Sequence, residues 1–291
     1  MGIGRVTQKA MSEGTLRGLQ ASLARTAKLQ NELSSGRRIA VPSDDPSGTA
    51  SAMTFRGQRS AAEQHLRNID GAIGRLNTTD SALMDLSDRL NAIRNLMVQS
   101  KSGAISAEGQ AALSAQVGAV KGNVVDIYNT RYLDRPVFGG TVPGDVAIDA
   151  SGAYVGNDAD VSVRISRDAS VRVDVKGTAV AADTVPALLD QIAAEMTSAG
   201  GVSQASFDAL DAARSKVLQA IGDIGARGSR VESARSQVDS LRLDLQGRIS
   251  ESEDIDLPET IMNLQAQQVA YQSALGAASK VIQTSLVDFL K

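Results

Sequence analysis

Few residues in this 291-residue chain have side chains that could catalyse a reaction or bind a metal ion. The chain has no cysteine and a single histidine, His65. This composition excludes disulfides, thiol catalysis, thiolate metal sites and multi-histidine metal centres. No GxxxxGK[ST], HExxH, GxSxG or GxGxxG motif occurs in the context that its chemistry requires. We therefore expect no catalytic residue, no metal site and no bound cofactor.

Acidic residues supply the remaining candidates for paired catalytic carboxylates or a divalent-cation site. Asp44 and Asp45 precede Pro46, an order typical of a turn followed by the N-cap and first residue of a helix. A second acidic group lacks the spacing of a calcium-binding loop and is predicted to be a solvated junction between helices. It comprises Glu251, Glu253, Asp254 and Asp256, the last being the predicted N-cap of the final helix.

Other polar and glycine residues have structural explanations that need no ligand. His65 is predicted to be a solvated helix residue, and Arg37 and Arg38 a solvated turn. The formal net charge of -3 and the pI of about 5.3 argue against binding to nucleic acid through phosphate contacts. Three glycines inside a helical pattern predict close packing or local flexibility, because glycine costs about 1 kcal/mol relative to alanine there. They are Gly222, Gly225 and Gly228.

The overall composition favours long helices over a compact enzyme core. Aromatic residues make up only 3 % and tryptophan is absent, and helices packed through Leu, Ile, Val and Ala need few rings. No run of about 18 apolar residues predicts a membrane span, so we expect no membrane partner. Met1–Arg5 leads into polar residues rather than the apolar segment of a classical signal peptide. Composition alone would place the protein in the cytosol.

Both ends of the chain are predicted to form amphipathic helices. Between Thr15 and Leu33 most apolar residues fall on one helical face, and Ser34–Gly36 is a stop signal. After Asp256 the apolar residues are again three and four positions apart, and Glu259 is placed to complete a capping box with Asp256. Two such ends invite pairing with each other and with other copies.

The clearest periodicity lies between residues 203 and 252. At about 1.5 Å per residue, a helix over this range would be roughly 75 Å long, which suits a rod. Its apolar stripe is predicted to pack inside the chain against the long helix that contains Ala62–Met97. The heptad positions are Leu210, Val217, Ile224, Val231, Val238 and Leu245, with companions at Ala213, Ala220, Arg227, Ala234, Leu241 and Arg248.

The middle of the chain has a different pattern. From Pro136 onward, glycines, prolines and asparagines predict turns. Val161–Ile165 and Val171–Val175 alternate β-branched with polar residues, which predicts two half-exposed strands. A short helix from about Val185 to Thr197 closes this insertion.

Sequence motifs at both ends resemble the signatures of the flagellin superfamily. At the N-terminal end they are Leu33–Ile39 (LSSGRRI) and Pro42–Pro46 (PSDDP); at the C-terminal end they are Ser250–Leu257 (SESEDIDL) and Gln265–Gln268 (QAQQ). Four further stretches are more similar to the hook-associated branch at the hook–filament junction than to flagellins. They are Arg5–Gln8, Asp44–Gly48 (DDPSG), Tyr132–Leu133 with Val137–Gly140, and the end Ile282–Leu290. The resemblance covers roughly residues 1–140 and 203–291.

The resemblance implies a mainly α fold, a long antiparallel coiled-coil or helical-bundle rod built from both termini, with a small β-rich insertion. Residues 1–45 with 255–291 would form an inner terminal coiled-coil domain. Residues 46–136 with 203–254 would form the helical rod, and residues 137–202 the outer insertion. Incorporation would bury an assembly interface made of Leu16, Leu19, Leu23, Leu33, Leu264, Tyr271, Leu275, Ile282, Leu286 and Phe289.

The function implied is structural: an adaptor at the hook–filament junction that polymerises through its terminal helices and lets the filament assemble. Its partners would be other copies of itself, a hook-associated protein on the hook side, flagellin on the filament side and an export chaperone. The resemblance also implies an extracellular position in the flagellum after export by the flagellar type III pathway, which needs no cleaved signal peptide. Three alternatives remain at this point: flagellin itself, an unrelated coiled-coil scaffold or secretion-tip protein, and an enzyme.

Overall fold

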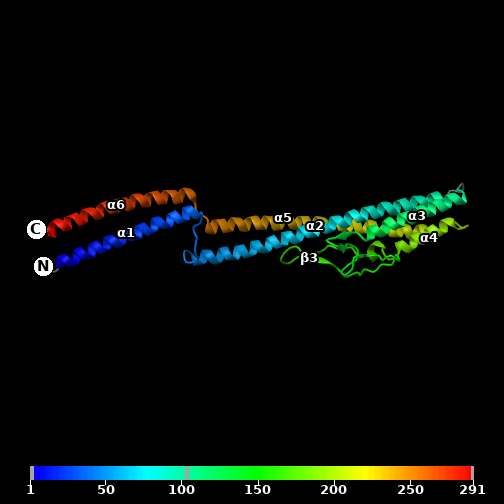
Figure 1. The fold of residues 1–291 in the computed structure, drawn as a ribbon, viewed down its shortest axis with the longest axis horizontal. Coiled ribbons are helices and arrows are strands. Elements are labelled where there is room, and N and C mark those ends of the chain that lie inside the picture. The colour runs from blue at the N-terminus through cyan, green and yellow to red at the C-terminus, as the bar shows by residue number, and fades with distance from the viewer. Residues whose placement is uncertain (1–2, 102–104, 290–291) are drawn as a thin grey trace. The chain divides into compact units, whose positions relative to one another are not determined.

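The computed structural model describes residues 3–101 and 105–289, and these form a mainly α-helical chain (Figure 1). The chain divides into two compact units, one of residues 1–60 with 243–291 and one of residues 61–242. The expected fold class, long helices with a small β insertion, is confirmed. The α-helices are α1 (Ile3–Ser35), α2 (Pro46–Ser100), α3 (Ala107–Tyr128), α4 (Val185–Thr197), α5 (Gln204–Glu253) and α6 (Leu257–Phe289).

Local sequence signals set the helix boundaries as predicted. Gly36 follows α1 with a φ of 70°, a left-handed conformation that glycine adopts without steric cost. Its N–H donates to the carbonyl of Glu32 at 2.8 Å. At the start of α2, the Gly48 N–H donates to the Asp45 carboxylate at 2.9 Å, which makes Asp45 the N-cap and Pro46 the first helical residue.

The core of the second unit forms where the apolar stripes of α2, α3 and α5 meet. Leu83, Leu86, Leu90 and Ile93 of α2 are fully buried, as the sequence predicted. The α5 positions at seven-residue intervals from Leu210 to Val238 are buried in the same cluster. This confirms that these stripes are an intramolecular core rather than an exposed surface.

The companion positions of the heptad on α5 are correct only in its first part. Ala213 and Ala220 are buried, but Leu241 is 49 % exposed and Arg248 is exposed. Past Val238 the buried residues are Leu245 and Ile249. The second buried residue of the heptad therefore lies four residues after the first in this part of α5, instead of three as at Ala213 and Ala220. A straight helix drifts about 20° per heptad relative to a strict seven-residue repeat, which accounts for this shift along a 50-residue helix.

The insertion contains two small antiparallel sheets. Strands β1 (Arg131–Tyr132) and β2 (Arg135–Pro136) form one, and β3 (Ser162–Arg164) and β4 (Ser170–Arg172) form the other. In the second sheet Val163 pairs with Val171, which places the two predicted alternating runs side by side, although each strand has only three residues. The closing helix α4 has the predicted bounds, and a 3₁₀ turn (Thr178–Val180) precedes it.

Side-chain hydrogen bonds hold much of the irregular part of the insertion. The Asn129 carboxamide oxygen accepts from the N–H groups of Ala147 at 2.8 Å and Ile148 at 2.9 Å. The Tyr128 hydroxyl donates to the buried carbonyl of Val180 at 2.7 Å, and its ring packs edge-on against Phe138 at 6.0 Å. These bonds satisfy backbone groups that no strand ladder reaches.

None of the helices, as far as they are described, is long and apolar enough to cross a membrane.

Candidate functional site: the terminal helix pair

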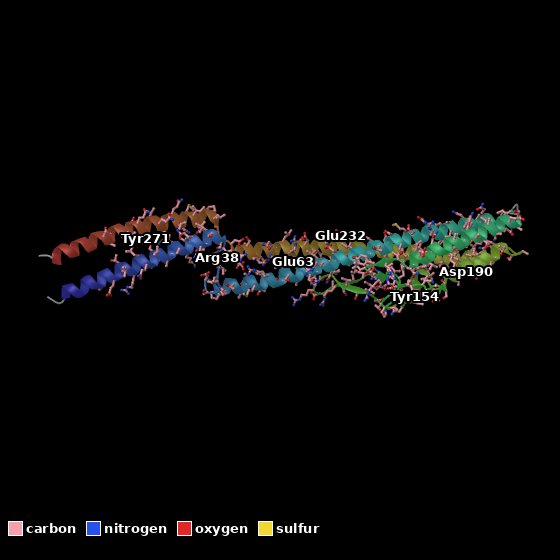
Figure 2. The ribbon with its side chains drawn as sticks, in the orientation of Figure 1. Arg38, Glu63, Tyr154, Asp190, Glu232 and Tyr271 are labelled. Carbon is pink, nitrogen blue, oxygen red and sulfur yellow. The ribbon has the colours of Figure 1, made fainter. Side chains whose placement is uncertain are left out.

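Helices α1 and α6, at opposite ends of the sequence, lie side by side in the first unit (Figure 1). Their partly buried residues are three or four positions apart, as in a two-helix coiled coil. The Gln267 side-chain amide of α6 donates to the Ser22 hydroxyl of α1 at 2.7 Å, which ties the two helices together. We call the apolar part of this contact the inner seam; it comprises the partly buried Leu19, Leu29, Leu33, Leu264 and Tyr271. Tyr271 is labelled on α6 in Figure 2.

The inner seam alone gives this pair a thin core. Among the side chains described in α1 and α6, only Thr260 and Ala278 are buried; the others are partly or fully exposed. A fully buried leucine contributes about 1.5 to 3 kcal/mol, and two helices that bury so little receive a small part of that per residue. Helices of this kind depend on further packing for their stability.

A second set of apolar side chains on the same helices faces solvent. Leu16 is 59 % exposed and Leu23, seven residues later, is 54 % exposed. On α6, Leu275 is 43 % exposed. Large apolar side chains that recur at helical spacing on an exposed surface are typical of an interaction surface. We call the exposed leucine and isoleucine side chains that fall on one side of each helix the outer stripe; it comprises Leu16, Leu23, Leu257, Ile261 and Leu275. Met262 and Val269 are also exposed, but they lie on another side of α6.

The structure therefore divides the predicted interface residues into two groups. Leu19, Leu33, Leu264 and Tyr271 lie in the inner seam, within one chain. Leu16, Leu23 and Leu275 lie in the outer stripe. The side chains of Ile282, Leu286 and Phe289 fall outside the described residues. The assembly interface as a whole stays a prediction.

The segments that lead into and out of this helix pair form a polar junction. The Arg38 guanidinium donates to the carbonyl of Ser252 at 2.8 Å, and the Arg38 N–H donates to the carbonyl of Glu253 at 2.6 Å. The Ile255 N–H returns a bond to the carbonyl of Gly36 at 3.2 Å. Arg37 and Arg38 are exposed as predicted, yet Arg38 has a structural role that links two segments distant in sequence.

The prediction of a fully solvated acidic junction is wrong for one of its four members. Glu253 is only 6 % exposed and its carboxylate forms an ion pair with Arg56 at 2.5 Å. Its position on the last turn of α5 continues the buried face of Leu245 and Ile249, so the carboxylate leaves water and requires a cationic partner. The sequence of α5 predicts this burial only if inward positions are counted four residues apart after Leu245, which places Ile249 and then Glu253 on the buried face.

Asp256 caps the last helix as predicted, because the Glu259 N–H donates to its carboxylate at 3.0 Å. Asp44 accepts bonds from the N–H groups of Val41 at 3.0 Å and Ala40 at 3.1 Å. These two bonds lower the pKa of Asp44, and bonds from the Gly48 N–H and the Ser47 hydroxyl lower the pKa of Asp45. The paired aspartates are therefore a turn and a helix cap.

His65 and the acidic residues were the remaining candidates for a metal site. No group of three or more His, Asp or Glu side chains in it is arranged to hold a metal ion. His65, predicted to be solvated, is half-buried on α2, and its Nδ1 atom is enclosed by protein. What the arrangement can do is present an apolar stripe on a marginally packed helix pair.

Comparison with known proteins gives matches at both ends of the chain. Residues 6–137 match the family model of the bacterial flagellin N-terminal helical region, and residues 207–290 match that of the bacterial flagellin C-terminal helical region. The chain is 21 % identical to flagellar hook-associated protein 3 of Escherichia coli, over 99 % of this chain and 100 % of that protein. It is 25 % identical to a flagellin of Halalkalibacterium halodurans, over 89 % of this chain and 88 % of that protein.

Solved structures share the fold. A putative flagellar hook-associated protein from Vibrio parahaemolyticus matches with a TM-score of 0.66 at 20 % identity, covering 72 % of this chain and 100 % of that one. FlgL of Bacillus cereus matches with a TM-score of 0.50 at 19 % identity, covering 70 % of this chain and 99 % of that one.

Proposed function

Because the chain belongs to the flagellin superfamily of flagellar structural proteins, we propose that it is an adaptor of the hook–filament junction. The observation that carries this proposal is the match to hook-associated protein 3, which runs end to end in both chains. In this role the protein performs no catalysis. Its work is mechanical: copies assemble on the hook and present a surface on which the filament grows.

The outer stripe supports assembly through the terminal helices. Leu16, Leu23 and Leu275 expose apolar surface that neighbouring copies would bury. The unassembled helix pair has little core of its own, so further ordering would accompany incorporation and offset part of this gain. Contacts that repeat from one copy to the next around an axis would close a ring or a short helical array.

The partners follow from the same role. We propose contacts with other copies of this chain, with a second hook-associated protein on the hook side and with flagellin on the filament side. Export through the flagellar type III pathway, assisted by a chaperone, would deliver the chain to this extracellular position. A chain without cysteine is suited to that route, because no disulfide has to form or break on the way.

A second candidate function is that of flagellin, the filament subunit. The observation that favours it is the 25 % identity to flagellins, slightly above the 21 % identity to hook-associated protein 3. The two candidates share the helical ends and the assembly mechanism. They differ in abundance and position, which a genetic experiment separates.

The experiment is a clean deletion of the gene, examined by negative-stain microscopy together with an assay for flagellin in the medium. We expect hooks without filaments and flagellin monomers released into the medium. Bare hooks with no released flagellin would instead identify this chain as the flagellin. Normal filaments in the deletion strain would contradict both functions.

A further inference from the structure

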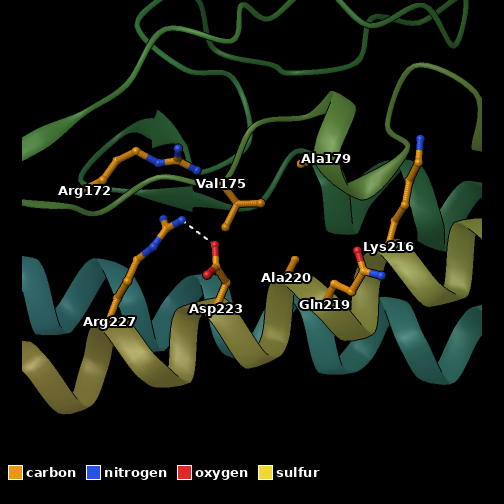
Figure 3. A pocket seen from close by; sticks show the side chains of 8 residues that line it. All are labelled: Arg172, Val175, Ala179, Lys216, Gln219, Ala220, Asp223 and Arg227. Carbon is orange, nitrogen blue, oxygen red and sulfur yellow. Dashed lines mark hydrogen bonds and ion pairs between the residues drawn. The ribbon is translucent and has the colours of Figure 1, made fainter.

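The insertion and its closing helix are fastened to α5 at two places, and the two attachments differ in chemistry. At the first, the Arg227 guanidinium of α5 donates to the carbonyl of Asp174 in the insertion at 2.8 Å and forms an ion pair with Asp223 at 2.6 Å (Figure 3). A guanidinium is not deprotonated in proteins, and a backbone carbonyl does not titrate. The bond from Arg227 to Asp174 is therefore independent of pH.

The second attachment joins the end of α4 to the start of α5 through one carboxylate. Glu195, in the last turn of α4, accepts from the Ser203 N–H at 2.9 Å and from the Ser206 hydroxyl at 2.8 Å. Its other oxygen accepts from the Gln191 amide at 2.8 Å and from the Ser203 hydroxyl at 3.3 Å. Ser206 is only 1 % exposed, so water has little access to its part of this network.

These bonds complete a capping box for α5 with a residue from another helix. Ser203 precedes α5, and its hydroxyl accepts from the Ser206 N–H at 3.2 Å, as an N-cap does. In an ordinary capping box the third residue of the helix is a glutamate or glutamine that bonds back to the N–H of the N-cap. That position in α5 is Ser206, and the Ser203 N–H donates to Glu195 of α4 instead.

The Glu195 carboxylate gains its stabilisation from α5 rather than from its own helix. The last turn of a helix carries partial negative charge and disfavours a carboxylate, whereas the first turn carries partial positive charge and favours one. The turn between the two helices, residues 198–202, contains Gly200 and Gly201. A Cβ atom added to either glycine would meet nothing within 4 Å, and Gly201 has a φ of 62°. Glycine is conformationally permissive, so the bonds of Glu195 restrain a turn that can move.

All the hydrogen-bond donors to Glu195 are uncharged. They lower its pKa, the Ser203 N–H most of all, against the opposing effect of burial, and no charged neighbour contributes to this shift. The charged side chains on the surrounding elements have contacts of their own. They are Lys101 after α2, Glu108 of α3, Asp190 of α4 and Asp208 of α5.

We propose that Glu195 is an acid-sensitive latch that holds the end of α4 to the start of α5. When the carboxylate is ionised, both of its oxygens accept hydrogen bonds and the turn of residues 198–202 is closed. Protonation converts one oxygen into a hydroxyl, which donates, so at least one of the bonded donors loses its acceptor. The turn and the first turn of α5 then open, while the bond from Arg227 to Asp174 remains.

The direction of the pH effect follows from the lowered pKa of Glu195 in the folded chain. The stabilisation from the latch is present above the ordinary glutamate pKa, and it is lost as the pH falls through the lowered value. The latch belongs to the single chain and does not depend on the proposed junction role.

Hydrogen–deuterium exchange of the unassembled full-length protein, followed by mass spectrometry, tests the latch. Glu195→Gln places an NH₂ group where one carboxylate oxygen lies and so imitates the protonated side chain at neutral pH. At pH 7 this variant should lose protection of residues 198–207 at least tenfold, since a hydrogen bond to a charged group is worth about a factor of ten or more. Residues 83–93 of α2 and 171–176 of the insertion should keep their protection, which shows that the chain stays folded.

A matched control and two changes of solvent separate the latch from a general weakening of α4. Asp190→Asn removes the other carboxylate of α4, which pairs with Lys121 at 2.6 Å, and should leave the protection of residues 198–207 unchanged. The difference between the unmodified chain and Glu195→Gln, corrected for intrinsic exchange rates, should shrink as the pH falls and then vanish. Sodium chloride at about 1 M should not reproduce the opening, because salt screens ion pairs and these donors are neutral.

Three results would overturn the proposal. One is equal protection of residues 198–207 in the unmodified chain and Glu195→Gln at pH 7. Another is a difference that stays constant down to the pH at which residues 83–93 open, because the carboxylate would then act without titrating. The third is an equal loss of protection in Asp190→Asn, which would assign the effect to weaker packing of α4 as a whole.

Discussion

Replacement of Leu275 by aspartate tests whether the outer stripe drives assembly. In the single chain Leu275 is 43 % exposed and already buries roughly half of its side chain, so the change should lower the free energy of unfolding by about 1 kcal/mol. In the proposed assembly the exposed part of this side chain would be buried as well, which would contribute about 1 kcal/mol more. An aspartate at this position would lose that hydrophobic contribution, and burial of its carboxylate would cost several kcal/mol of desolvation free energy. The combined loss of about 3 kcal/mol or more reduces incorporation at least a hundredfold.

Two assays separate assembly from folding in this variant. Urea unfolding followed by circular dichroism measures stability, and complementation of the deletion strain, read by microscopy, measures incorporation. Leu275→Met keeps the apolar volume and should complement; Ser273→Asp places the same charge on another side of α6 and should complement as well. Normal filaments with Leu275→Asp would refute the reasoning. So would equal failure of Ser273→Asp, because the effect would then arise from charge alone.

Four further substitutions and one pH dependence follow from the described contacts. Glu253→Gln breaks the ion pair with half-exposed Arg56 and should lower the free energy of unfolding by about 1 to 2 kcal/mol in urea titrations; an unchanged midpoint would contradict its structural role. Asp256→Ala removes the cap of α6 and should cost about 1 kcal/mol, with faster protease cleavage near the start of that helix. Tyr128→Phe leaves the Val180 carbonyl without its donor and should cost about 1 to 2 kcal/mol, measured by thermal unfolding. The pKa values of Asp44 and Asp45 are lower in the folded chain than in the unfolded one, so their stabilisation is present above the ordinary aspartate pKa and is lost as the pH falls through the lowered values. Asp45→Asn should therefore reduce the acid sensitivity of protease cleavage around residues 37–46, whereas an identical pH profile would contradict this assignment.

Helical periodicity and capping residues made much of the fold predictable. Stripes of leucine, isoleucine and valine located α2 and α5, because burial of one face is what stabilises a long helix. Asp45, Asp256 and Gly36 marked helix ends through local backbone bonds that depend only on neighbouring residues. These features are local in sequence, so a single sequence contains the information.

Features that depend on distant contacts were less predictable. The ion pair of Glu253 with Arg56 joins residues almost two hundred positions apart, and neither local sequence predicts it. The irregular part of the insertion is held by hydrogen bonds to single side chains such as Asn129. Sequence propensities predict turns in this region, but they do not show which side chain bonds to which backbone group. The companion positions of the heptad on α5 were wrong past Val238, although Leu245 is buried as predicted, because a strict repeat of seven does not follow a straight helix.

The position of the protein in the intact organelle tests the junction role most directly. Isolated hook–filament structures would be labelled with an antibody against the insertion, residues 137–202, and a gold conjugate, then viewed by electron microscopy. The proposed function predicts label confined to the boundary between hook and filament, and lost in the deletion strain. Label distributed along the whole filament would show that the chain is the filament subunit and would contradict the junction role.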